Sequence, residues 1–390
     1  MKTISKYMFV LLALAIASCE KPSLESPTDV ELVPEAGYIR FSTGVATKAP
    51  MIENMRGKNF GVLGYFYGYS TKWDNARPLA EPELFYNQKV DCSAEGVCTY
   101  DINSSLAGNQ PKPWNLSLKY SFFAYYPMAA DDNGISISAA NAVNMPTVTY
   151  HLPLKSQSEG EVNPGEIQDL MTAYAVDKTA GDGKVGFTFQ HRLFCIEVYS
   201  QNFNTTKMVK VKDENGEEAE QEIDADEIIS NLTLTINNLA YESITVPMMK
   251  GDSKSAPTMV ANSHGPVTFR LLESNDKVTV PSQDEEGSGA VSLSGDKYIM
   301  LIPQDASGTK LTGTLSFDTT DANGNTLSYK LSESENETDN LKRALKFETD
   351  LNFEEGKKYN MTLSFTGKTV VIATAKAGSW EASSVNHEFE

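Results

Sequence analysis

Cysteines are the residues of this 390-residue chain best suited to covalent chemistry, and the first of the four follows an apolar run. The run extends from Tyr7 to Ser18, after Lys2 and Lys6, and Cys19 comes next. Its twelve residues are too few to cross a bilayer, which takes about 20. A basic start, a short apolar stretch and small residues at the boundary are typical of a secretory signal peptide.

The position of Cys19 makes this interpretation more specific. The residues Ile16-Ala17-Ser18-Cys19 resemble a bacterial lipobox, in which the cysteine becomes the new N-terminus and carries acyl chains. Two or more acyl chains give stable anchoring, at about 0.8 kcal/mol per buried methylene. We therefore expect a lipoprotein signal peptide at residues 1–18, lipidation of Cys19, and a flexible tether rich in Pro, Ser and Glu at residues 19–36. An ordinary signal peptide with a cysteine at its boundary is the alternative.

The other three cysteines predict no metal site. Cys92 and Cys98 lie in the segment CSAEGVC, close enough for a disulfide across a small hairpin, and an exported protein can keep such a bond. Two free thiols are the alternative of equal weight. Cys195 lies in an apolar run and is expected to be a buried free thiol. The sequence shows no Cys/His spacing typical of zinc.

The chain offers little for catalysis. None of its four histidines lies in a GxSxG or HExxH pattern, and Walker and GxGxxG loops are missing from the sequence. His191 shares strand periodicity with Phe189 and Leu193, which favours a half-buried structural histidine. The segment 321–325 resembles part of a calcium loop but lacks the distal glutamate, so we interpret it as a hairpin turn. We expect neither an enzyme nor a bound cofactor or metal.

The net charge also excludes some partners. The chain has 52 acidic and 33 basic residues and a formal charge of −19. Such a chain is repelled by nucleic acid and by anionic lipid surfaces. The densest acidic stretch, residues 213–227, is interpreted as a solvated hairpin or loop. A cation site is the sharper alternative, but the spacing fits no EF-hand.

The elements that would position these residues are almost all strands. Alternating apolar and polar residues, with many aromatics, predict strands at residues 38–42, 59–67, 119–126, 185–198, 232–236, 298–303, 311–317 and 359–365. Short helices are expected near residues 168–173 and 339–346. Short strands separated by frequent turn signals predict an all-β fold of antiparallel β-sandwiches.

The length of the chain predicts two domains, because one ordinary core rarely serves so many residues. A Gly-rich turn near residues 178–183 is the expected boundary. The N-terminal domain is therefore predicted at residues 37–180 and the C-terminal domain at residues 181–390.

Several short motifs occur in an order that is similar to one family. They are Phe85-Tyr86-Asn87-Gln88-Lys89-Val90, Pro113-Trp114, Tyr120-Ser121-Phe122-Phe123-Ala124-Tyr125-Tyr126-Pro127, Gln168-Asp169-Leu170-Met171-Thr172-Ala173, Phe187-Thr188-Phe189-Gln190-His191-Arg192-Leu193 and Gly356-Lys357-Lys358-Tyr359. The ordered set resembles the fimbrillin family, the lipoprotein precursors of type V pili and related surface proteins. The resemblance implies two β-sandwich domains of the transthyretin-like type, anchoring in the outer membrane at the cell surface, and a structural role in a fimbrium that supports cell adhesion.

The resemblance also implies how such subunits assemble. A trypsin-like protease cuts after a basic residue that follows the first strand, and the strand of another subunit fills the groove that opens. Thr47-Lys48-Ala49 stands where the family often has Thr-Arg-Ala, so we assign processing to Lys48. Arg40 is the nearest arginine, but it lies within the predicted first strand. A plain turn residue is the alternative for Lys48.

The donor strand implied by the resemblance lies near the other end of the chain. It comprises Thr369, Val370, Val371, Ile372, Ala373, Thr374 and Ala375, an apolar and β-branched run. A donated strand satisfies backbone groups that cost about 1–3 kcal/mol each when buried without a partner. An ordinary last strand of its own domain is the alternative. The implied partners are other fimbrillin subunits, outer-membrane lipid through acylated Cys19, and a host or bacterial surface ligand.

A surface lipoprotein that binds glycan or host protein without polymerising is the competing hypothesis, since one fold serves many functions. Trp73 and Trp114 would stack on sugars if exposed, although core packing is the commoner role of such residues. An accessory domain of a secreted glycosidase is a third hypothesis, which the lack of a recognisable catalytic set disfavours.

Overall fold

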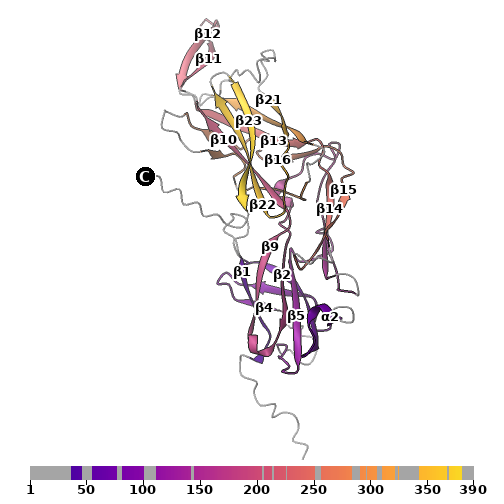
Figure 1. Ribbon diagram of the computed structural model, residues 1–390. Coiled ribbons are helices and arrows are strands. Elements are labelled where there is room, and N and C mark those ends of the chain that lie inside the picture. Colours follow the sequence, from indigo (N-terminus) through magenta and orange to yellow (C-terminus); the bar gives the residue numbers. More distant parts are fainter. Residues whose placement is uncertain are drawn as a thin grey trace, which may run out of the picture.

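The computed structural model shows an almost entirely β protein, which confirms the predicted all-β class (Figure 1). It describes residues 37–45, 55–76, 81–100, 111–141, 145–203, 206–212, 215–224, 226–250, 256–282, 290–295, 297–304, 310–320, 324, 342–366 and 369–379. The described helical segments are short: α2 (Trp73–Ala76), η3 (Pro164–Glu166) and η4 (Ala180–Asp182).

The N-terminal sheet closes on itself as a barrel, with strand order β1-β4-β3-β2-β5-β8-β9. Its strands are β1 (Arg40–Val45), β2 (Asn59–Gly68), β3 (Phe85–Cys92), β4 (Cys98–Tyr100), β5 (Leu118–Tyr126), β8 (Met171–Lys178) and β9 (Lys184–His191). Every neighbouring pair is antiparallel except β1 with β9, whose parallel pairing closes the ring. The predicted sandwich therefore takes the form of a barrel in this half of the chain.

Strand periodicity explains what fills the barrel. Along β9, Val185, Phe187 and Phe189 are buried and alternate with more exposed residues, as the period of 2 requires. Strands β2 and β5 are instead buried on both faces. Their outer face, which includes Tyr65, packs against Trp73 of α2, with ring centroids 4.9 Å apart. The barrel is thus joined to the larger core of the protein through β2 and β5.

Two five-stranded sheets form the other end of the molecule (Figure 1). One contains β10 (Phe194–Asn202), β18 (Val291–Ser292), β19 (Ile299–Leu301), β22 (Lys357–Thr366) and β23 (Thr369–Ser379). The other contains β13 (Glu227–Ile236), β16 (Val267–Arg270), β17 (Val278–Val280), β20 (Leu311–Thr320) and β21 (Lys342–Thr349). They share one core, in which the rings of Phe317 and Phe365 meet edge to face at 6.2 Å.

A third sheet joins early and late parts of the chain. Its order is β15-β14-β7-β6. The strands are β6 (Ile135–Ser138), β7 (Thr147–His151), β14 (Tyr241–Pro247) and β15 (Thr258–Ala261). The remaining strands, β11 (Thr206–Lys212) and β12 (Glu218–Asp224), form a separate hairpin that projects at one end of the molecule (Figure 1). This hairpin accommodates most of the acidic stretch 213–227.

The structure differs from the predicted elements and boundary in four places. The predicted strand 185–198 is two strands, β9 and β10, which belong to different sheets and separate at Arg192-Leu193. The helix predicted near residues 339–346 is wrong, since β21 begins at Lys342, and no helix occupies 168–173. Pairing also crosses the expected boundary at residue 180, because β9 completes the barrel while β6 and β7 pair beside β14. The division into two domains stays a prediction, and a boundary after His191 fits the barrel better.

We predict that Gly313→Ala destabilises the protein by about 1–3 kcal/mol, the usual cost of overpacking. Gly313 lies in β20, and a Cβ there would come within 2.2 Å of the Thr235 carbonyl oxygen and 2.5 Å of the Phe347 ring. The matched control is Gly186→Ala in β9, where the nearest atom would be 3.8 Å away. Urea unfolding of both variants checks this, and equal midpoints would contradict it.

Candidate functional site

The first strand of the barrel is attached unevenly to its two neighbours. On one side β1 pairs in parallel with β9 through six residue pairs, from Arg40↔Lys184 to Val45↔Phe189. On the other side it pairs with β4 through one residue pair, Phe41↔Cys98. Just before β1, the Ile39 amide donates to the Lys112 carbonyl at 2.8 Å. The backbone of β1 is therefore held chiefly along one edge.

Phe41 anchors β1 in the barrel interior. Its side chain is 2% exposed. The ring stacks on Phe187 at 5.4 Å and meets Phe122 at 5.6 Å, Tyr100 at 5.8 Å and Phe85 at 5.9 Å, each edge to face. These four rings come from β9, β5, β4 and β3, so one side chain of β1 contacts most of the barrel wall. Edge-to-face and offset arrangements are the favoured geometries of aromatic pairs.

A hollow of about 380 Å³ separates β1 from β4 where backbone pairing is missing. Ile39 and Phe41 line it on the β1 side, and Val97 and Tyr100 line it on the other. The Tyr100 hydroxyl donates to the Ile39 carbonyl at 3.2 Å and accepts from the Lys112 amide at 2.8 Å. Burial raises the pKa of Tyr100, so this hydroxyl keeps its proton at neutral pH. The tyrosine thus ties the two walls together at one end.

The cysteines lie beside this hollow. Cys92 of β3 and Cys98 of β4 are register partners and are joined by a disulfide. The bond holds β4 against β3, and the Thr43 hydroxyl of β1 lies 3.8 Å from the Cys98 sulfur. Cys195 is a buried free thiol, as its apolar surroundings predict, and burial raises its pKa.

The predicted donor segment forms part of β23. This strand pairs with β22 along its length, from Thr366↔Thr369 to Lys357↔Ser379. In the sheet order β18-β10-β22-β23 it stands last. Among the described residues, β22 is its one paired neighbour. The segment Thr369–Ala375 therefore lies at a sheet edge, and its use as a donor stays a prediction.

A cluster of ionisable residues lies where the chain leaves the barrel. His191 Nδ1 is 2.6 Å from Asp169 Oδ2, and both side chains are 1% exposed. Next in sequence, Arg192 Nη1 lies 3.2 Å from Glu355 Oε1, which Lys250 Nζ also approaches at 3.1 Å. Burial lowers the pKa of Arg192, and the Glu355 carboxylate opposes that shift.

This cluster explains two of the sequence motifs together. Asp169 comes from the QDL motif and His191 from the FQHRL motif, and the structure places them in contact. His191, which was predicted to be half-buried, is in fact buried, with 2% of its surface exposed. A pair so enclosed cannot reach a substrate, so its arrangement suits support of the junction.

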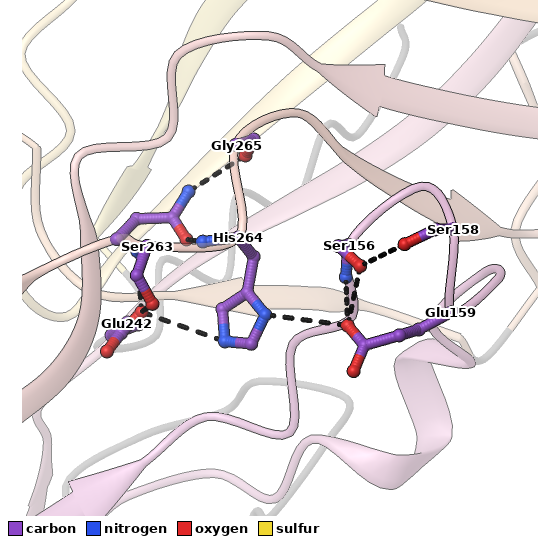
Figure 2. A network of polar contacts seen from close by, with 8 residues as sticks. Ser156, Ser158, Glu159, Glu242, Ser263, His264 and Gly265 are labelled. Carbon is purple, nitrogen blue, oxygen red and sulfur yellow. Dashed lines mark hydrogen bonds and ion pairs between the residues drawn. The ribbon is translucent and has the colours of Figure 1, made fainter.

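A second histidine network lies at the surface and joins the loop after β7 to residues of β14 and of the loop after β15 (Figure 2). His264 Nδ1 is 3.8 Å from Glu159 Oε2, and its Nε2 is 3.6 Å from Glu242 Oε2. Figure 2 shows the imidazole between the two carboxylates, each of which is held by a serine. Donors from Ser156 lower the pKa of Glu159, and donors from Ser263 lower that of Glu242. The network fastens the loop after β7 to β14.

The described part of the chain offers neither metal ligands nor a membrane helix. No group of three or more His, Cys, Asp or Glu residues is placed to bind a metal ion within it. Nor does it include a helix with the length and hydropathy needed to cross a bilayer. Trp73 and Trp114 are 2% and 6% exposed, so the sugar-stacking role considered for them is wrong. Cys19 and Lys48 lie outside the described residues.

Comparisons with known proteins identify one matching family and several similar solved structures. A family profile described as fimbrillin-like matches residues 47–380. The chain is similar to a fimbrial protein from Bacteroides vulgatus, with 16% identity, a TM-score of 0.53, and coverage of 87% of this chain and 99% of that one. It is also similar to a protein from Bacteroides uniformis whose name assigns it provisionally to cell adhesion, with 15% identity, a TM-score of 0.47, and coverage of 89% and 99%. A comparison with curated proteins finds no match.

We predict that Phe41→Ala destabilises the barrel by about 3–5 kcal/mol, the range for removing a buried aromatic ring. The four rings around Phe41 come from four different strands and cannot all close over the gap. Ser42→Ala, which changes the neighbouring half-buried side chain, is the control and should cost less than about 1 kcal/mol. Denaturant unfolding checks both, and a Phe41→Ala midpoint equal to that of wild type would rule out the anchor role.

We predict that part of the stability is lost below pH 4.5 through Glu242. Donors from Ser263 hold its pKa below the ordinary 4.5 in the folded state, so the stabilisation is complete above pH 4.5. It disappears as the pH falls through the lowered pKa. Because Glu242 is near the surface, the loss should be about 1 kcal/mol or less. Thermal unfolding at pH 7 and pH 3 should show a smaller difference for Glu242→Gln than for wild type; an identical difference would exclude this role.

Proposed function

The chain belongs to the fimbrillin-like family, and from this membership we propose that it is a structural subunit of a type V pilus at the cell surface. It is exported as a lipoprotein, loses its N-terminal strand to a protease, and polymerises by exchange of strands between subunits. Assembly of this kind needs no catalytic site, bound cofactor or metal. Cell adhesion is the activity that such a fibre supports.

The observation that carries this proposal is the attachment of β1. It is the first described strand, it closes the barrel, and a parallel ladder with β9 supplies nearly all of its backbone pairing. Lys48, the predicted processing residue, follows Val45 by three positions. The family match begins at residue 47, directly after β1, which supports a division of the chain at this point.

Loss of β1 would leave a groove with unpaired backbone groups and exposed aromatic side chains. The exposed edge of β9 would present amide and carbonyl groups, which cost about 1–3 kcal/mol each when buried and unpaired. The space left by Ile39 and Phe41 would expose the aromatic rings that now surround them. A strand from another chain would pair with the backbone groups and cover the aromatic side chains at once, as in β-strand addition. An opened edge without such a strand is an aggregation hazard.

The donor in this proposal is the segment Thr369–Ala375 of a second copy. It lies in β23, which stands last in its sheet and would lose pairing with one described neighbour on leaving. Its β-branched residues suit a strand that fills apolar pockets. The family match ends at residue 380, directly after β23, so the proposed donor strand lies just inside the matched region and β1 lies just outside it.

The lipid anchor in this proposal is acylated Cys19 in the outer membrane. A cut after Lys48 separates this anchor from every strand after β1. The membrane segment would therefore keep the leader strand, while the trimmed subunit becomes free to join a fibre. Lipidation and polymerisation are thus coupled through one peptide bond.

We predict that a site-specific cut after Lys48 converts the folded chain into polymers. The cut is best made by a protease site inserted there, so that the result does not depend on the natural protease. Polymers should resist dissociation in detergent, because strand exchange is stabilised by a complete backbone ladder. Size exclusion and denaturing gels without boiling measure the outcome.

Two variants test the donor strand and the lipid anchor separately. Deletion of residues 369–390 should abolish the polymers while the uncut chain keeps the unfolding transition of its barrel. Cys19→Ser should abolish palmitate labelling in cells and leave polymerisation of the cut, purified chain unchanged. Cut wild-type protein that stays monomeric at high concentration would overturn the assembly role.

A further inference from the structure

We propose that the hollow between β1 and β4 is the first docking point for residues 380–390 of a second copy of this chain, reached while β1 is still in the barrel. The inference rests on the proposed function, since it concerns how β1 is displaced. The hollow would thereby have a role in assembly that strand exchange by itself does not require.

Because β1 is paired unevenly, a competing strand meets different resistance on its two sides. A competing strand that approached from the β9 side would have to break a ladder of six residue pairs before gaining any contact. On the β4 side a single residue pair, Phe41↔Cys98, stands in the way, and the hollow lies beside it. Displacement of β1 therefore starts on the β4 side, where the competing strand can gain contacts before β1 loses its pairing with β9.

The walls of the hollow are largely apolar and remain accessible. Val97 is 62% exposed at this surface, while Phe41 is buried and Tyr100 partly buried along the same walls. The disulfide between Cys92 and Cys98 keeps β4 on β3, so the wall does not collapse toward β1. An apolar side chain of a partner can therefore enter without prior unfolding of the barrel.

The charge around the hollow is opposite to that of the chain as a whole. Arg40 and Lys184 both line it, both are exposed, and they are register partners on adjacent strands. The exposed Lys184, next to a second basic residue in a protein of net charge −19, favours an acidic partner.

Residues 380–390, with the sequence WEASSVNHEFE, have the matching chemistry. They contain three glutamates, at positions 381, 388 and 390, and no lysine or arginine. They also contain Trp380 and Phe389, whose rings suit the apolar walls. The segment directly follows β23, so docking it would bring the proposed donor strand of the same copy next to β1.

The direct test is binding of a labelled synthetic peptide of residues 380–390 to the full, uncut chain, followed by fluorescence anisotropy. We expect binding that weakens as salt increases. Val97→Trp, which blocks the hollow, and Lys184→Gln, which removes one cation, should each weaken it at least tenfold. A peptide with its three glutamates changed to glutamine should bind at least tenfold less tightly.

Controls separate a blocked hollow from a damaged fold. Val260→Trp adds the same bulk to a residue that is 53% exposed on β15, in a different sheet, and should bind the peptide like wild type. Thermal unfolding should be equal in all variants, and Val97→Asp is the substitute if Val97→Trp unfolds early. Equal peptide affinity for wild type and the Val97 variant, or no binding at millimolar peptide, would overturn the inference.

The assembly reaction distinguishes this inference from the proposed function. After the engineered cut at Lys48, Val97→Trp should polymerise at least tenfold more slowly than wild type and reach the same final yield. If both polymerise at one rate, the docking role of the hollow is wrong and the subunit role stands. If neither polymerises, the subunit role fails, and the peptide measurement alone decides whether the hollow binds this acidic segment.

Discussion

The parallel ladder between β1 and β9 is the contact on which the N-terminal barrel depends. It is the last pairing needed to close the ring of seven strands, and the one parallel pair among them. Because β1 and β9 are separated by most of the barrel sequence, nothing local holds them together. Closure relies on the six backbone pairs and on Phe41, which contacts rings from four other strands. A sheet that is closed by its first strand can be opened by removing that strand.

The other constraint is the junction at His191 and Arg192. These residues leave the barrel ladder at the end of β9 and lead directly into β10. Asp169, which is buried, and Glu355, which is 20% exposed, come from segments far apart in the chain, so these contacts fix three stretches of backbone at one place. Removing one member of the buried Asp169–His191 contact is unfavourable, because the other group loses that hydrogen bond while it stays buried. The junction therefore resists sliding between the barrel and the remaining sheets.

Much of the fold could be predicted because strand periodicity is a local property. The alternation in β9 and the aromatic run of β5 identify strands without knowledge of their neighbours. The pairing of β6 and β7 with β14 could not be predicted, since register across about a hundred residues leaves no local pattern. The helix expected near 339–346 fails for a related reason: Leu345 and Phe347 follow strand periodicity, and β21 buries both against β20.

The candidate site was predictable from the sequence in part. The family resemblance is confirmed, and it directs attention to the first strand, yet the uneven pairing of β1 is visible only once β4 and β9 are placed. The hollow beside β1 had no signal in the sequence, because its walls come from four separate segments. Cys19 and Lys48 lie outside the described residues, and their roles stay predictions.

The covalent attachment of β1 to the rest of the chain has a consequence for timing. A strand joined through residues 46–54 competes for its slot at an effective concentration that short linkers place in the millimolar range. In the proposed assembly, an intact chain would thus carry its own competitive inhibitor, and a high local concentration of copies would not by itself trigger association. Hydrolysis of one peptide bond in that segment would turn β1 into a dilute ligand that can dissociate. The start of fibre growth would then be set by proteolysis and not by the concentration of subunits.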